Sequence, residues 1–199
     1  MQMSGNHGRF TNPWAHKGHG LADILRWKLG GLLKRQKKPK PDAAALPQSI
    51  KLDAASLQTP ADESWRATWL GHSSFLVQSR TVSLLIDPIF TDYCSPIPMP
   101  QLRRKTATPC CVADLPKIDA VLLTHSHYDH LDIQTLRQLG TETRLITPEG
   151  HAHWLAKKGF RNVIELPWHG VQAISDEVTI TATPAQHFTS RSLWDRDLG

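Results

Sequence analysis

The 199-residue sequence lacks the features of several protein classes. No stretch approaches the roughly 18–20 uninterrupted apolar residues of a membrane-spanning helix, and no apolar run follows the N-terminus as in a secretory signal. Three cysteines, Cys94, Cys110 and Cys111, are too few for a disulfide scaffold, and the adjacent pair favours a reducing compartment. Since hydrophobic residues make up 40% and charged residues 21%, the composition predicts a globular protein of the cytoplasm.

Positive charge is concentrated in the N-terminal third of the chain. Residues 1–60 hold ten Lys and Arg against three Asp and Glu, whereas residues 61–199 hold 13 against 15. The densest run, residues 34–40 (KRQKKPK), is either a solvated linker or a segment attracted to an anionic membrane surface. Because the rest of the chain is nearly neutral and no aromatic residues alternate with this run, we expect no nucleic-acid partner.

The pattern divides the chain into a basic arm, residues 1–64, and a body, residues 65–199. Apolar residues at helical spacing predict a short amphipathic helix over 21–33, with Asp23 near its start and basic residues after its end. This helix either docks on the body or lies on a lipid surface. Four prolines among small and polar residues predict a linker over 36–64.

The body alternates β-rich runs with two helix candidates, which indicates an α/β protein. The run 121–123 is apolar on both faces and predicts a buried strand in a helix-covered sheet. Segment 90–116 holds five prolines and predicts a long loop, a feature often linked to function. The predicted strands are 68–77, 82–86, 120–124, 144–147, 162–166 and 178–183, and the predicted helices are 133–139 and 149–158, stopped by Gly140 and Gly159.

Four metal-ligating side chains follow the buried strand within six residues: His125, His127, Asp129 and His130. Such a group is costly to desolvate without a cation to share. In extended backbone His125 and His127 point to the same side and can bind one ion, while the other two can reach a second. Imidazole and carboxylate without a nearby thiolate favour zinc or another borderline divalent ion.

The pattern His125-x-His127-x-Asp129-His130 after a buried strand resembles the signature of the metallo-β-lactamase-fold hydrolases. Further blocks are similar to one branch, the N-acyl-phosphatidylethanolamine-hydrolysing phospholipase D family and its bacterial relatives. Among them are Asn-Pro-Trp, Leu-Arg-Trp, Trp-Leu-Gly-His and Pro-Ala-Gln-His. The resemblance extends over nearly the whole chain, through residues 8–14, 25–27, 68–72, 85–90, 115–122 and 183–187.

This resemblance implies an α/β fold, the metallo-β-lactamase-like αββα sandwich, with two zinc ions in a complete site. His125, His127 and His187 would bind the first zinc. Asp129 and His130 would bind the second and are the expected catalytic pair.

Other candidate residues receive supporting or structural roles. Asp87 ends a predicted strand, and we expect it to support the ligands or fix a loop rather than bind metal. His72 either supports the site or makes a structural hydrogen bond. His151 and His153 lie two apart on a predicted helix and cannot face one ion together, so both are expected on the surface, as is His169.

The reaction implied by the resemblance is phospholipase D-type cleavage. A metal-bridging hydroxide would attack the phosphorus of an N-acyl-phosphatidylethanolamine, giving phosphatidic acid and an N-acylethanolamine. The basic arm and loop 90–116 would contact lipid at the inner membrane face. Two alternatives stay open: a lactonase or esterase of the same fold, and a metal-binding fragment without activity.

One departure from the family pattern concerns the end of the chain. The sequence stops at Gly199, twelve residues after His187, whereas the family continues and supplies a bridging aspartate and a further histidine. Asp195 and Asp197 lack the expected sequence context, and no histidine follows. We therefore expect the N-terminal half, or slightly more, of the sandwich, with one sheet face exposed to a partner chain or a second protomer.

Overall fold

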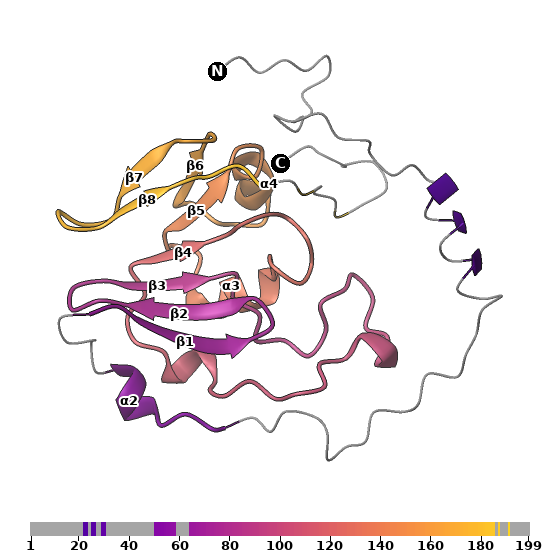
Figure 1. Ribbon diagram of the computed structural model, residues 1–199, viewed down its shortest axis with the longest axis horizontal. Helices are drawn as coiled ribbons and strands as arrows, with labels where there is room; N and C mark the ends of the chain where they lie inside the picture. The colour runs from indigo at the N-terminus through magenta and orange to yellow at the C-terminus, as the bar shows by residue number, and fades with distance from the viewer. Residues whose placement is uncertain are drawn as a thin grey trace. The chain divides into compact units, whose positions relative to one another are not determined.

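The computed structural model describes residues 22–23, 25–26, 29–30, 50–58, 64–185, 187 and 191 (Figure 1). By its internal contacts the chain divides into two compact units, Asn12–Gln48 and a larger one of Met1–Thr11 with Ser49–Gly199. In the first unit the described residues are helical, where the sequence predicts a helix over 21–33. No helix of the described residues is both long and apolar enough to cross a membrane.

A six-stranded sheet forms the centre of the larger unit, with its strands in chain order (Figure 1). The first three strands are antiparallel and the last four are parallel, sharing the third. The strands are β1 (Arg66–Gly71), β2 (Ser74–Gln78), β3 (Ser83–Ile86), β4 (Ala120–Leu122), β5 (Leu145–Pro148) and β6 (Val163–Leu166).

Helices form two of the three connections between the parallel strands, as is usual for crossovers in such sheets. α3 (Ile133–Leu139) joins β4 to β5, and α4 (Ala152–Lys157) joins β5 to β6. Two short 3-10 turns, η2 (Pro100–Leu102) and η3 (Val112–Asp114), lie in the long connection from β3 to β4. The prediction of a mixed α/β protein is therefore confirmed.

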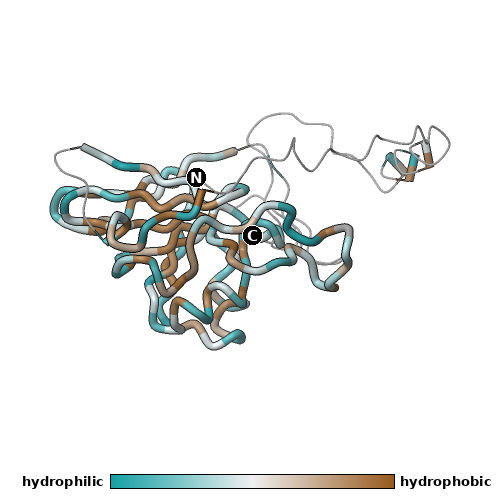
Figure 2. The backbone as a smooth tube through the Cα atoms, turned by 90° about the horizontal axis from the view of Figure 1, so that it is seen from below, coloured by the Kyte–Doolittle hydropathy of each residue, from teal (hydrophilic) through white to brown (hydrophobic). Residues whose placement is uncertain are grey.

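Hydrophobic residues are frequent along the backbone of the larger unit (Figure 2). They form two cores, one on each face of the sheet, as the two-residue period of a strand requires. Leu85, Val121 and Leu145 belong to the core on the helix side, which includes Leu136 of α3 and Leu155 of α4. The core on the other side is covered by a hairpin of β7 (Val171–Ala173) and β8 (Thr179–Thr181). This second core includes Leu84, Ala120, Ile146, Leu166 and Val178.

Two elements differ from the predictions. The single predicted strand 68–77 is a hairpin, because Gly71 and His72 adopt positive φ angles of 111° and 48° and reverse the chain between β1 and β2. β7 was not predicted, since three residues are too short a run to indicate a strand.

The predicted linker over 36–64 is wrong for residues 50–58. α2 (Ala54–Gln58) packs on the body through Leu57, which is 2% exposed and belongs to the helix-side core. Gln78 donates to the carbonyl of Leu57 at 3.0 Å, and Leu52 donates to the carbonyl of Pro109 at 2.8 Å. The five residues of α2 are too few to give a clear periodic signal, so the sequence pattern missed this anchor. The boundary at residue 64 stays a prediction.

Candidate metal centre

The candidate ligands gather where the strands of the sheet end. Asp87 directly follows β3, residues 125–130 follow β4, and His72 lies in the turn from β1 to β2. Because the carboxyl ends of neighbouring parallel strands meet at one edge of a sheet, segments far apart in the sequence converge there. His187 joins them from beyond β8.

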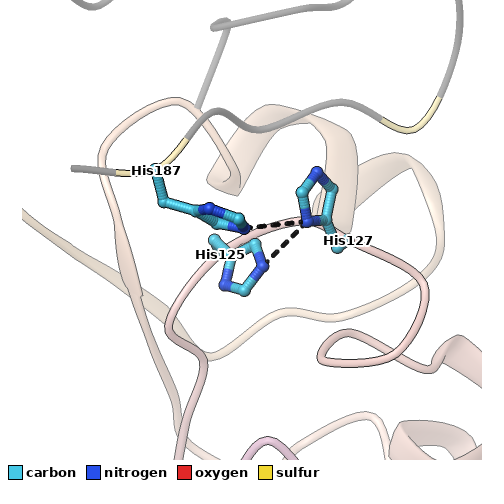
Figure 3. Close-up of side chains that lie close together, drawn as sticks. All are labelled: His125, His127 and His187. Atoms are coloured by element: carbon cyan, nitrogen blue, oxygen red, sulfur yellow. Dashed lines mark hydrogen bonds between the residues drawn. The ribbon is translucent and has the colours of Figure 1, made fainter. Parts of the chain in front are cut away.

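The first group contains the three histidines predicted to share one ion. Nδ1 of His127 lies 3.0 Å from Nε2 of His125 and 3.2 Å from Nε2 of His187, and the three rings face one another (Figure 3). One nitrogen of each ring lies within 4.8 Å of the other two. In a tetrahedral zinc site with bonds of about 2.0–2.1 Å, neighbouring ligand atoms are about 3.4 Å apart. The donor atoms therefore fit a divalent ion of this kind.

The second group contains His72, Asp129 and His130, whose ligand atoms also lie within 4.8 Å of one another. Oδ2 of Asp129 is 2.9 Å from Nε2 of His72 and 3.9 Å from Nε2 of His130. The two groups are adjacent, since the ring centroids of His125 and His130 are 4.0 Å apart. His72 thus lies at the site, in contact with a predicted ligand rather than in a remote structural bond.

Asp87, which is 1% exposed, is connected to both groups by hydrogen bonds. Its Oδ2 accepts hydrogen bonds from Nδ1 of His130 at 2.7 Å and from the hydroxyl of Thr124 at 2.6 Å. That hydroxyl is in turn 2.9 Å from Nδ1 of His125. Each contact leaves the Nε2 of a histidine directed at its group, which is how buried carboxylates fix the ring orientation of metal ligands.

Two histidines of the first group have lowered pKa values, which favours the uncharged rings that bind a cation. Burial, with smaller contributions from neighbouring imidazoles, lowers the pKa of His125 to about 3. Burial also lowers the pKa of His127. Both rings are therefore neutral near pH 7, the form in which imidazole binds metal. The pKa of His130 is raised, because its hydrogen bond to Asp87 favours the charged ring.

Three other histidines lie among the described residues, and they differ in burial. The expectation that His151 lies on the surface is wrong: it is 3% exposed, and its Nδ1 donates to the carbonyl of Pro148 at 3.1 Å. It is the N-cap residue of α4, and the two-residue spacing from His153 does not reveal its burial. His153 and His169 are exposed, as expected.

Two residues near the centre were not identified from the sequence. The hydroxyl of Thr124 connects the carboxylate of Asp87 to the ring of His125 by hydrogen bonds. A hydroxyl residue at the end of a buried strand could have indicated this role. Arg191 donates to two carbonyls of the segment that carries the ligands, residues 125–131, and nothing in its local sequence indicates such a contact.

Comparison with known proteins gives consistent matches. A model of the beta-lactamase superfamily domain matches residues 83–198. An uncharacterized protein of Mycobacterium tuberculosis is 32% identical over 174 residues, 85% of this chain and 44% of that protein. The mitochondrial N-acyl-phosphatidylethanolamine-hydrolyzing phospholipase D of Saccharomyces cerevisiae is 32% identical over 166 residues, 77% of this chain and 35% of that enzyme.

A metal-dependent hydrolase of Koribacter versatilis is also 32% identical, over 124 residues that make up 61% of this chain and 47% of that protein. The chain thus spans less than half the length of each of these three relatives.

Proposed function

The chain belongs to the beta-lactamase superfamily, and from this we propose that it is a metal-dependent hydrolase whose ions bind at the two ligand groups. His125, His127 and His187 bind the first ion, and Asp129 and His130 bind the second. The observation that carries the proposal is the convergence of three imidazole nitrogens at 3.0 and 3.2 Å beside a second group. Zinc fits this donor set of imidazole and carboxylate.

When bound, two such ions supply Lewis acidity that activates a water molecule and neutralises charge developing on the substrate. The protein's own residues hold the ligands for this task. Asp87 fixes the rings of His130 and, through Thr124, of His125. Nε2 of His72 lies 2.9 Å from Oδ2 of Asp129 and would hold this carboxylate in place beside His130.

For the substrate, we propose a phosphodiester of the N-acyl-phosphatidylethanolamine type. The yeast relative named as a phospholipase D for this lipid supports it, as do the sequence blocks shared with that family. Exposed apolar side chains in segment 90–116 also support a lipid substrate: Ile97 is 64% exposed, Met99 45% and Leu102 46%. The segment is tied to the start of α3, directly after residues 125–131, since Thr91 donates to Asp132 at 2.8 Å.

The basic arm is proposed as a second lipid contact, most of it outside the described residues. Removing residues 1–40 should weaken binding to vesicles that contain anionic lipid, because the run 34–40 carries five positive charges. Sedimentation with neutral vesicles is the control. Equal binding of both proteins to anionic vesicles would contradict the arm's role.

A second candidate is hydrolysis of a non-lipid ester or lactone at the same centre. The Koribacter relative supports this, because it is also 32% identical, over 124 residues, and its name specifies only a metal-dependent hydrolase. A third is a metal-binding chain without activity. The three differ in their products and can be separated directly.

The test compares three substrates on the zinc-loaded chain: N-acyl-phosphatidylethanolamine in mixed micelles, a chromogenic phosphodiester and a lactone. We expect phosphatidic acid by mass spectrometry from wild type and from His153→Ala, an exposed histidine outside the centre. His127→Ala should abolish it. Turnover of the lactone alone would favour the second candidate, and zinc binding without any turnover the third.

A further inference from the structure

We propose that Arg191 is a positioning residue that holds the ligand loop, residues 125–131, in the shape that metal binding needs. The inference rests on the proposed function, because it concerns the same centre. Nη1 of Arg191 donates to the carbonyl of Ser126 at 2.7 Å and to the carbonyl of Leu131 at 2.8 Å. One nitrogen therefore binds near the start and at the end of the loop.

The first of these bonds acts on the geometry of the first group. Ser126 is buried and lies between His125 and His127. The orientation of its carbonyl fixes the peptide plane that joins it to His127. The direction in which a side chain points depends on the orientation of the peptide planes next to its residue. This plane therefore helps to decide whether His125 and His127 point to the same side.

The second bond acts on the other end of the loop. Leu131 follows His130 directly and is fully buried in the helix-side core. Its amide donates to the carbonyl of His127 at 2.8 Å, so the loop already turns back on itself here. Holding the Leu131 carbonyl closes this turn and keeps His130 beside Asp87.

Aromatic rings hold the guanidinium in its place. The guanidinium carbon lies 4.0 Å from the ring centroid of Tyr128 and 4.9 Å from that of Trp154. Tyr128 belongs to the loop itself, and its hydroxyl donates to the carbonyl of Arg191 at 3.1 Å. Trp154 belongs to α4, so Arg191 connects the loop to a helix packed on the sheet.

The position of Arg191 in the sequence links this contact to the third ligand. Arg191 lies four residues after His187, whose Nε2 is 3.2 Å from Nδ1 of His127. Docking of Arg191 on the loop therefore limits how far His187 can move from the other two histidines. Arginine suits this task because it stays charged at all relevant pH values and stacks on aromatic faces.

The test measures metal binding rather than turnover. Zinc affinity is determined by chelator competition for wild type, Arg191→Met and Arg191→Lys, together with the visible spectrum of the Co²⁺-loaded proteins. Residues that orient metal ligands typically contribute 10–100-fold in affinity, so Arg191→Met should lower zinc affinity by about that factor and alter the Co²⁺ spectrum. Arg191→Lys, which keeps a charged donor, should restore part of the loss.

Arg161→Met is the matched control, because this exposed arginine pairs with Glu142 at 3.7 Å away from the centre. It should leave zinc affinity unchanged. Zinc affinity of Arg191→Met equal to that of wild type would overturn the proposal, as would a loss that Arg191→Lys does not relieve. If Arg191→Met does not fold, Tyr128→Phe removes only the hydroxyl that donates to Arg191. It should lower zinc affinity a few-fold, and no change would likewise overturn the proposal.

Failure of the proposed function would look different. A wild-type protein that binds zinc yet hydrolyses none of the three substrates would refute the function. The ranking of zinc affinities among the Arg191 variants would still decide the positioning role.

Discussion

Asp87→Asn is the most direct test of how the centre is organised. Asp87 accepts three hydrogen bonds in the core: from the amide of Thr124 at 2.8 Å, from its hydroxyl at 2.6 Å and from His130 at 2.7 Å. Its φ angle is 40°, a left-handed conformation that asparagine adopts readily, so the substitution changes chemistry without straining the backbone.

The magnitude follows from which bonds asparagine can keep. Its single carbonyl oxygen can accept from the amide of Thr124, while its NH₂ group meets two donors where Asp87 had an acceptor. Two hydrogen bonds to a charged acceptor contribute about 3–6 kcal/mol together. The hydroxyl of Thr124 can rotate to accept from the NH₂ group, so we expect a loss of about 2–4 kcal/mol in the free energy of unfolding.

Urea denaturation of the metal-free proteins measures this loss, and zinc competition measures the consequence for the site. We expect zinc affinity to fall by about 10–100-fold, because the rings of His125 and His130 lose their orientation. Asp92→Asn is the matched control: this exposed carboxylate pairs with Arg103 at 2.9 Å and should contribute about 0–1 kcal/mol. A loss below about 0.5 kcal/mol for Asp87→Asn, with unchanged zinc affinity, would refute this reasoning.

Three further predictions follow from the same structure. Elemental analysis should find about two zinc ions per chain in wild type and about one in Asp129→Ala, and a single ion in wild type would contradict a second site. Burial lowers the pKa of His125 to about 3 from about 6.5 in the unfolded chain, so the stability it contributes to the metal-free protein is present above pH 6.5 and lost towards pH 3. His125→Gln should therefore reduce the fall in the free energy of unfolding between pH 6.5 and pH 3, as measured by urea titrations at several pH values. The same fall in the variant and in wild type would argue against this role of His125. Leu155→Ala, at a fully buried position of α4, should lower the free energy of unfolding by about 2–5 kcal/mol in thermal denaturation, and a loss below 1 kcal/mol would contradict a packed core there.

Much of the sheet could be predicted because its strands carry strong local patterns. The apolar run at 121–123 predicted a buried strand, and β4 lies there with helices packed on one side. Gly140 and Gly159 correctly marked where α3 and α4 end. The hairpin between β1 and β2 was missed because its turn is short and the apolar residues on either side predict a single strand. The positive φ angles of Gly71 and His72 reveal the reversal.

At the site, local spacing identified His125, His127, Asp129 and His130, and the structure brings them into two groups. Their roles as ligands stay predictions. Contacts that depend on the tertiary fold could not be read in the same way. The position of His72 beside Asp129 and the burial of His151 arise from how separate segments pack, and neither has a pattern of its own.

The contacts that define the centre also bear on the order in which the protein folds. His130 meets Asp87 across 43 residues, His72 meets Asp129 across 57, and His187 meets His127 across 60. Pairing of β1 with β2 closes only a short turn, whereas each of these contacts first requires a long loop to close, at a larger cost in chain entropy. The hairpin should therefore form early and the metal centre late. A nascent chain would then bind its ions only after the parallel strands have paired. Free metal ions should therefore slow unfolding more than they accelerate folding.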